Sequence, residues 1–194
     1  MADHHPRTQE VWLVRHAETE WSRSGRHTGR TDVPLTDGGR ERARQLGARL
    51  RGRTFALVLV SPLDRARETA RLAGLGDCAQ VRDDLLEWDY GDYEGITTKD
   101  IRKQRPGWYL WKDGVPGGET ADEVGARCDR VIEEILGTDG DVAIFAHGHM
   151  LRALGARWVE APVPFGGRLY LSTGSFSVLG FEREVRVIRL WNET

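Results

Sequence analysis

The sequence is poor in the features that mark metal, redox and membrane proteins. It contains only two cysteines, Cys78 and Cys128, which lie far apart in neither metal-ligand nor CxxC spacing. This favours reduced cysteines and a cytoplasmic protein, and a bridge between the two is the less favoured alternative. No apolar run reaches the roughly 18 residues that a membrane-spanning helix needs. The opening stretch, MADHHPRTQE, also lacks the apolar core of a signal peptide.

A strong charge of one sign, internal repeats and low-complexity tracts are missing as well. The formal net charge is −2, with 39% hydrophobic and 30% charged residues among the 194. Such a balance provides no basic field for nucleic acid, and this composition is typical of a globular protein with one buried core. We therefore expect a single domain over residues 1–194, with a frayed end over residues 1–9. No nucleic-acid or membrane partner is expected.

Short apolar runs alternate with helical patterns along the chain. Buried strands are predicted at residues 11–14 (VWLV), 55–60 (FALVLV) and 141–146 (DVAIFA). The stretch 176–191 predicts a hairpin of two strands that turns near residues 182–184. This alternation favours an α/β fold, a three-layer α/β/α sandwich with a mostly parallel central sheet.

Capping residues mark where the helices are expected to begin. Thr36 caps a predicted helix over residues 36–50, and Thr120 with Glu123 forms a capping box for a helix that runs to about Leu136. Ser61 is expected to cap another helix, with Pro62 at its first position and Asp64 completing a box. A fourth helix is predicted from about His149 to Val159.

The three apolar strands end in residues that can bind an anion. VWLV is followed by Arg15 and His16, FALVLV by Ser61 with Arg65 just beyond it, and DVAIFA by His147. Ligands bind beyond the carboxyl ends of the strands in open α/β sheets, so these side chains are expected at one edge. Any one of them alone is more simply a polar residue that meets solvent. Three strands together predict a phosphate site.

These residue types also indicate a reaction. Two arginines can hold phosphoryl oxygens and stabilise their charge in the transition state. A histidine facing the phosphorus can attack it and form a phosphohistidine. A carboxylic acid is still needed, to protonate the departing alkoxide and later to deprotonate water. No Walker-type loop or carboxylate cluster suggests Mg²⁺.

These segments resemble the histidine phosphatase superfamily, which has the phosphoglycerate mutase-like fold. The family's signature is Arg-His-Gly at the end of the first strand, and LVRHAETEW matches it with Ala17 in place of glycine. We expect the added methyl group to be tolerated. The similarity continues, in the family's order, in SGRHTGRTDVPLTDGGRERA (24–43), SPLDRARETA (61–70), LLEWDYGDYEG (85–95), PGGET (116–120) and AHGHMLR (146–152).

The resemblance implies a role for each matching residue. His16 is expected to be the phosphorylated nucleophile and Glu87 the general acid and base. The rest of the phosphate pocket is expected to consist of Arg15, Arg65 and His147. The further implied substrate contacts are Ser22, where many members have asparagine, and Thr28, Gly29 and Gly148.

The family contains both phosphatases and mutases. Mutases carry a longer insertion after the acid/base segment, whereas the connection from Gly95 to Gly118 is short here, which favours hydrolysis. WDYGDYEG and SGRHTGRTD look most like the branch with acid phosphatases and sedoheptulose or fructose bisphosphatases. We expect a phosphatase without metal or cofactor that acts on small phosphorylated metabolites such as sugar phosphates. A phosphoglycerate mutase-type transferase and a non-catalytic module that binds phosphorylated ligands are the alternatives. The oligomeric state stays open, a homodimer being one alternative.

Several residues near these motifs have competing interpretations. Glu18, Asp89, Asp92 and Glu94 rival Glu87 as the acid, and for Asp92 and Glu94 we favour loop solvation or capping. The pair His147 and His149 is weak evidence for a metal, and His149 is expected with its ring near the phosphate pocket or substrate. The aromatic residues of PGWYLWKDG (106–114) either bury this loop or form a lid over the site; burial is slightly favoured.

Overall fold

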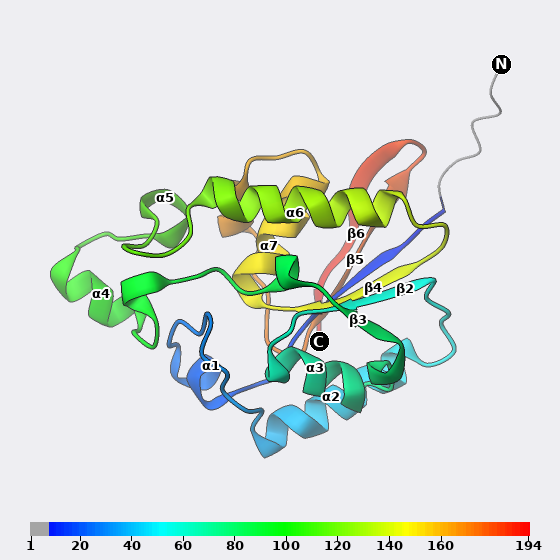
Figure 1. Ribbon diagram of the computed structural model, residues 1–194, viewed down its shortest axis with the longest axis horizontal. Helices are drawn as coiled ribbons and strands as arrows, with labels where there is room; N and C mark the ends of the chain where they lie inside the picture. The colour runs from blue at the N-terminus through cyan, green and yellow to red at the C-terminus, as the bar shows by residue number, and fades with distance from the viewer. Residues whose placement is uncertain (1–7) are drawn as a thin grey trace.

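Six strands form one mixed sheet in the computed structural model, which describes residues 8–194 (Figure 1). They are β1 (Val11–Arg15), β2 (Leu57–Val60), β3 (Ala79–Val81), β4 (Val142–Ala146), β5 (Phe176–Glu182) and β6 (Val185–Glu193). Their order across the sheet is β3-β2-β4-β1-β5-β6. The first four run parallel to one another, whereas β5 is antiparallel to both β1 and β6. The predicted mostly parallel sheet and C-terminal hairpin are confirmed, and Arg183 turns the hairpin with a φ of 57°.

Helices cover both faces of this sheet. Figure 1 shows α2 (Asp37–Leu50) and α3 (Asp64–Leu72) on one face, and α6 (Ala121–Leu136) and α7 (Gly148–Trp158) on the other. Successive strand residues point to opposite faces, so Leu13 packs in the core under α6 and α7 and Val14 in the core against α2 and α3. Each fully buried aliphatic side chain of this kind contributes about 1.5–3 kcal/mol to folding. The three-layer α/β/α sandwich is confirmed.

Of the three helix caps predicted from the sequence, two are confirmed and one is wrong, and the fourth predicted helix is α7, which begins at Gly148. Thr36 caps α2, and Thr120 with Glu123 forms the capping box of α6. Ser61, however, does not cap α3, which begins at Asp64 after Leu63 and has no side-chain cap from Leu63. The hydroxyl of Ser61 binds His147 instead, and the carboxylate of Asp32 accepts the Asp64 N–H at 2.7 Å. Tertiary partners therefore replaced the local capping box.

Shorter elements were not predicted. The helices are α1 (Glu20–Ser24), α4 (Thr98–Gln104) and α5 (Leu110–Asp113), and the 3-10 turns are η1 (Gly76–Cys78), η2 (Asp83–Leu85), η3 (Gly91–Tyr93) and η4 (Val163–Arg168). Strand β3 was missed because it has only three residues, mostly exposed, and lacks an apolar pattern. In Figure 1, α1, α4 and α5 gather at one end of the molecule.

The frayed end predicted for residues 1–9 is wrong at Gln9. Its side-chain amide donates to the carbonyl oxygens of Ile135, Thr138 and Gly140, and the residue is buried. Residues 1–7 lie outside the described residues. Cys78 is exposed, Cys128 is buried and both are free, so no bridge forms between them. None of the helices in residues 8–194 is both long and apolar enough to cross a membrane.

Candidate active site

A cavity of about 170 Å³ lies at the carboxyl ends of β1 and β4. Six of the residues predicted from the sequence as site residues line it: Arg15, His16, Ser22, Thr28, Glu87 and Gly148. Its other lining residues are Gly25, Arg26, His27, Tyr90, His149 and Arg152. Arg65, His147 and Gly29 are not in its wall. The fold thus brings the predicted nucleophile, the predicted acid and cationic side chains to one small space beyond the strand ends, as the position of ligand sites in open α/β sheets predicts.

His16 is held as a neutral imidazole with one free nitrogen. It is 4% exposed, and its Nδ1 lies 2.8 Å from the carbonyl oxygen of Ala17. A carbonyl only accepts, so Nδ1 carries the proton and Nε2 keeps its lone pair. Burial lowers the pKa of His16 well below its ordinary value, and the charges of Arg15 and Arg65 lower it further. The ring is therefore neutral at neutral pH, with the lone pair of Nε2 available for attack.

Ala17 fits without strain where the family signature has glycine. Glu160, Arg183 and Asn192 are the only non-glycine residues among residues 8–194 with positive φ, so the backbone at Ala17 requires no glycine. The methyl group is fully buried, and the N–H of Ala17 donates to Oγ1 of Thr69. The expectation that the substitution is tolerated is confirmed.

Arg15 has a donor that the protein leaves unused. Its backbone N–H donates to Ser175 and its Nη1 to the carbonyl oxygen of Leu171. Its Nε is the single buried side-chain nitrogen or oxygen among residues 8–194 that has no hydrogen-bond partner. A Cβ on Gly148 would come within 3.1 Å of the guanidinium, so glycine leaves this group room beside the start of α7. An anion bound in the cavity can supply the acceptor that Nε lacks.

Arg65 and His147 lie behind the cavity wall rather than in it. Both are fully buried, and the rings of His147 and His16 are 5.2 Å apart. Arg65 Nε donates to Nδ1 of His147, so the His147 proton sits on Nε2 and is donated to Oγ of Ser61 at 2.7 Å. The two terminal nitrogens of Arg65 donate to the carbonyl oxygens of Thr28, Gly29 and Thr31. Their direct contact with phosphate stays a prediction, because protein acceptors occupy these donors.

Glu87 is the one carboxylate that lines the cavity among the described residues. It is 4% exposed; its Oε1 accepts the N–H groups of Trp88 and Met150, and its Oε2 accepts that of His149. The first turn of α7 therefore holds the carboxyl group in place. Of its rivals, Glu18 binds the hydroxyl of Thr36 outside the cavity.

Two of the remaining acidic rivals stabilise neighbouring loops. Asp89 accepts the N–H of Gly91. Glu94 accepts the N–H groups of Gly29 and Thr31, at 3.0 Å each. These contacts agree with the capping role favoured for Glu94, although the N–H groups that it binds belong to a distant loop. Glu94 fastens the loop whose carbonyl oxygens surround Arg65.

Gly29 is required by this packing. A Cβ there would lie 2.6 Å from Oε2 of Glu94 and 2.9 Å from the carbonyl oxygen of Trp88. Both backbone groups of Gly29 are engaged, the N–H by Glu94 and the carbonyl by Arg65. Gly29 therefore does not line the cavity but packs behind its wall, where it holds Arg65 and Glu94.

Ser22 does line the cavity, but its hydroxyl forms the capping box of α1 with Thr19.

Five cavity residues were not predicted from the sequence: Gly25, Arg26, His27, Tyr90 and Arg152. Arg26 and His27 sit in the quoted SGRHTGRTD segment, and Tyr90 follows Glu87 by three residues. Arg152 follows His149 by three residues on α7, and this helical spacing could have revealed it. The expected position of the His149 ring near the pocket is confirmed. Among residues 8–194, no group of three or more histidine, cysteine or acidic side chains could hold a metal ion.

Trp108 and Trp111 bury the 106–114 segment, as favoured, whereas Tyr109 is exposed. Trp108 and Trp111 are 3% and 4% exposed, and α5 replaces part of the expected loop. Trp111 meets Trp88 edge-on at 5.5 Å, and the guanidinium of Arg152 lies 4.8 Å from its ring centre. Trp111 thereby supports a residue of the cavity wall from behind.

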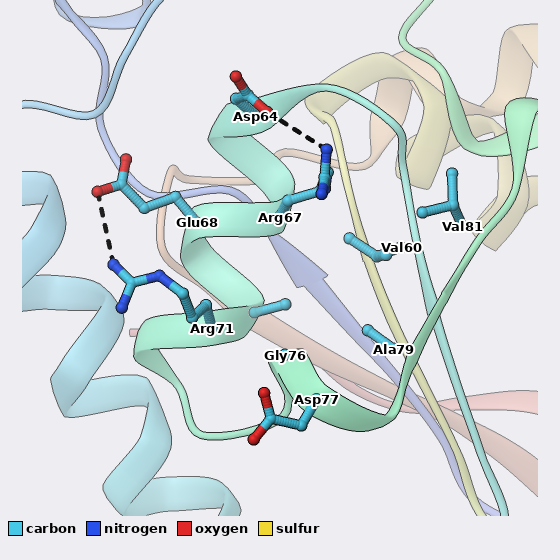
Figure 2. Close-up of a pocket in the computed structure, with 10 residues that line it drawn as sticks. Val60, Asp64, Arg67, Glu68, Arg71, Gly76, Asp77, Ala79 and Val81 are labelled. Carbon is cyan, nitrogen blue, oxygen red and sulfur yellow. Dashed lines mark ion pairs between the residues drawn. The ribbon is translucent and has the colours of Figure 1, made fainter.

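A larger hollow of about 510 Å³ lies between α3 and β3. Figure 2 shows two ion pairs along α3, Asp64 with Arg67 and Glu68 with Arg71, while Asp77 at the other side of the hollow has no such pair among the described residues. Three of the four paired side chains are exposed, and Glu68 is also bound by Arg40 at 2.9 Å. The hollow thus has no converging donors or nucleophile, and the smaller cavity is the candidate active site.

Burial lowers the pKa of every imidazole at this site. The pKa values of His147 and His149, like that of His16, lie well below the ordinary value, and the pKa of His27 falls to about 4. Loss of solvation of the charged form is the largest cause in each. All four rings are therefore neutral at neutral pH.

The free energy of unfolding is expected to fall as the pH drops from about 6.5 towards about 4. Below about pH 6.5 the unfolded chain binds protons at these imidazoles whereas the folded chain does not, so acid favours unfolding. The stability is present in full above about pH 6.5 and is lost as the pH falls towards the folded-state values. Urea midpoints between about pH 7.5 and 5 measure it. His27→Gln should flatten part of the dependence, and a constant midpoint would contradict it.

Comparison with known proteins also indicates a histidine phosphatase. The family profile described as "Histidine phosphatase superfamily (branch 1)" matches residues 11–194. An acid phosphatase from Mycobacterium tuberculosis (strain ATCC 25618 / H37Rv) is 43% identical over 185 residues, which cover 93% of this chain and 90% of that protein. A sedoheptulose 1,7-bisphosphatase from Saccharomyces cerevisiae is 39% identical over 184 residues, covering 78% of this chain and 68% of that protein. The solved structure of an open reading frame product from Mycobacterium tuberculosis has a TM-score of 0.90 and 41% identity, covering 97% of this chain and 99% of that one.

Proposed function

The chain belongs to branch 1 of the histidine phosphatase superfamily, and from this premise we propose that it hydrolyses phosphomonoesters of small metabolites through a phosphohistidine at His16. It is a phosphatase, as the named phosphatases among its relatives indicate. The observation that carries the residue-level proposal is the free Nε2 of neutral, buried His16, which shares a small cavity with Glu87 and with the unpartnered donor of Arg15.

The first step transfers the phosphoryl group to His16. The Nε2 lone pair forms the N–P bond as the P–O bond to the leaving group breaks, and Glu87 in its acid form protonates the departing oxygen. The ring gains positive charge during the attack, and the Ala17 carbonyl oxygen at Nδ1 stabilises it. Arg15 stabilises the charge on the phosphoryl oxygens. No proton has to leave the histidine.

The second step returns the enzyme to its starting state. Glu87, now a carboxylate, takes a proton from water as the water oxygen attacks phosphorus. The N–P bond breaks, its electron pair returns to Nε2, and inorganic phosphate leaves with Glu87 again in its acid form. Atoms and charges balance without a metal ion or cofactor. The Arg15, Ser22, Thr28 and Gly148 positions around the cavity are the proposed substrate contacts.

Sugar phosphates are the proposed substrate class. The relative from Saccharomyces cerevisiae is named a sedoheptulose 1,7-bisphosphatase, and the cavity of about 170 Å³ suits a phosphoryl group on a small polar leaving group. We place the enzyme in the cytoplasm, where its two free cysteines would stay reduced. The homodimer alternative stays a prediction.

Hydrolysis of p-nitrophenyl phosphate at mildly acidic pH, with and without EDTA, tests the proposal. Phosphate release at an equal rate in both is expected, since no step needs a metal. Loss of the activity in EDTA would contradict the metal-free mechanism. Interconversion of phosphoglycerates faster than their hydrolysis would favour a mutase instead, and binding of phosphate esters without turnover of any would favour a binding module.

A further inference from the structure

Tyr90 and His149 form a buried pair in the cavity wall. The Tyr90 hydroxyl lies 2.5 Å from Nδ1 of His149, and both residues line the cavity. Tyr90 is 2% exposed and His149 is half-buried. The pair joins the acid/base segment to the first turn of α7, and the sequence resemblance assigned neither residue a role in catalysis.

The direction of this hydrogen bond follows from the partners available. Burial and the nearby Glu87 raise the pKa of Tyr90 well above its ordinary value, so the phenol keeps its proton. His149 Nδ1 is the only side-chain partner that residues 8–194 provide for the hydroxyl. A buried hydroxyl that donates to none of its neighbours is costly, so Tyr90 donates and Nδ1 accepts.

The tautomer of His149 is thereby determined. Because Nδ1 accepts a hydrogen bond, the ring proton of the neutral imidazole sits on Nε2. Burial lowers the pKa of His149 well below its ordinary value, with Arg152, His27 and Arg15 adding to the shift, so the ring stays neutral. No partner within the described residues takes the Nε2 proton, and Nε2 is not among the buried side-chain atoms without a partner. Nε2 is therefore an accessible donor on a side chain that lines the cavity.

This donor lies beside Glu87, the residue proposed to protonate the leaving group. The backbone N–H of His149 binds Oε2 of Glu87, the group that protonates the departing oxygen in the proposed mechanism. Neighbouring rings hold the imidazole, with the centre of Trp111 at 5.4 Å and that of His27 at 6.1 Å. The imidazole is thus a rigid, uncharged donor beside the acid.

We propose that Nε2–H of His149 binds an oxygen of the leaving alcohol, such as a sugar hydroxyl, and that Tyr90 is the positioning residue that keeps the proton there. This inference rests on the proposed phosphatase function and deepens it. This neutral N–H group suits polyol leaving groups, because their hydroxyl oxygens can accept its hydrogen bond next to the ester bond. The leaving group of p-nitrophenyl phosphate has no hydroxyl group beside the ester oxygen, so this donor should contribute little to its hydrolysis.

Tyr90→Phe tests the proposal, since it removes only the hydroxyl. For the fastest substrate in a panel with fructose 1,6-bisphosphate and ribose 5-phosphate, kcat/KM should fall about tenfold, the value of one good hydrogen bond. The loss with p-nitrophenyl phosphate should be several-fold smaller. His149→Leu should change the same ratio, whereas His149→Gln, whose amide can donate from a similar position, should restore part of it.

Tyr93→Phe is the matched control. Its hydroxyl accepts from Arg105, and the residue does not line the cavity, so the ratio between the two esters should stay that of the unsubstituted protein. An equal loss on both esters in Tyr90→Phe, or no loss, would overturn the proposal. If no phosphatase activity were found at all, the proposed function would fail instead, and the tautomer could still be measured.

Nitrogen-15 NMR of the histidine rings provides that independent readout. His149 should show the Nε2–H form in the unsubstituted protein and a mixture of both neutral forms in Tyr90→Phe, with folding checked by the remaining spectrum. A predominant Nδ1–H form, or a charged ring at neutral pH, would also overturn the assignment.

Discussion

Replacement of His16 by alanine is expected to lower kcat by about 10⁴-fold or more, the scale on which removal of a covalent nucleophile acts. The loss is this large because, in the proposed mechanism, Nε2 of His16 forms the bond to phosphorus. His149 cannot substitute, since its Nε2 carries a proton and its Nδ1 binds Tyr90. The rate of phosphate release from p-nitrophenyl phosphate measures the effect.

Trapping the intermediate makes this test specific. A phosphate ester labelled in its phosphoryl group, quenched in alkali during turnover, should leave label on His16 in the unsubstituted protein and none in His16→Ala. His16→Gln, which preserves more of the side-chain volume, separates loss of the nucleophile from a collapse of the cavity. Label on another residue, or turnover by His16→Ala at the original rate, would refute the phosphohistidine.

Glu87→Gln is expected to lower kcat for alkyl phosphates by about 10²–10⁴-fold, the usual contribution of general acid–base catalysis. The amide oxygen can still accept the N–H of Met150, but its NH₂ group faces the N–H of His149 and can neither supply nor take up a proton. Both steps should therefore slow with an alcohol as leaving group. Steady-state rates on a sugar phosphate measure the loss.

The leaving group distinguishes the two roles of Glu87. p-Nitrophenol departs readily without a proton, so Glu87→Gln should still form the phosphohistidine from p-nitrophenyl phosphate while its breakdown by water stays slow. A burst of p-nitrophenol with accumulated phosphoenzyme is the expected signature. Glu18→Gln is the matched control, because that carboxylate binds Thr36 outside the cavity and its loss should leave the rate near that of the unsubstituted protein. The reverse ranking of the two variants would show that the acid was misassigned.

Short stretches of the sequence were sufficient to predict the layers of the fold and the residues at the centre of the site. The apolar run of β1 has to be buried, and Arg15 and His16 follow it at the point where the strand ends. Within a strand, neighbouring side chains point to opposite faces of the sheet. Where the strand ends this constraint no longer holds, so Arg15 and His16 both line one cavity. The capping box of α6 and the hairpin of β5 and β6 likewise depend on residues a few positions apart.

The tertiary structure decided which partners each polar group would have. Ser61 had the pattern of a helix cap, yet it binds His147, which follows strand β4 and lies 86 positions away. Glu94 was expected to be solvated or to cap its own loop, and the N–H groups that it binds belong to a loop 65 positions earlier in the chain. The tautomer of His149 depends on Tyr90, 59 positions before it. A buried donor or acceptor must be paired, and when its neighbours in sequence are engaged or point elsewhere, only the folded chain determines which distant group pairs with it.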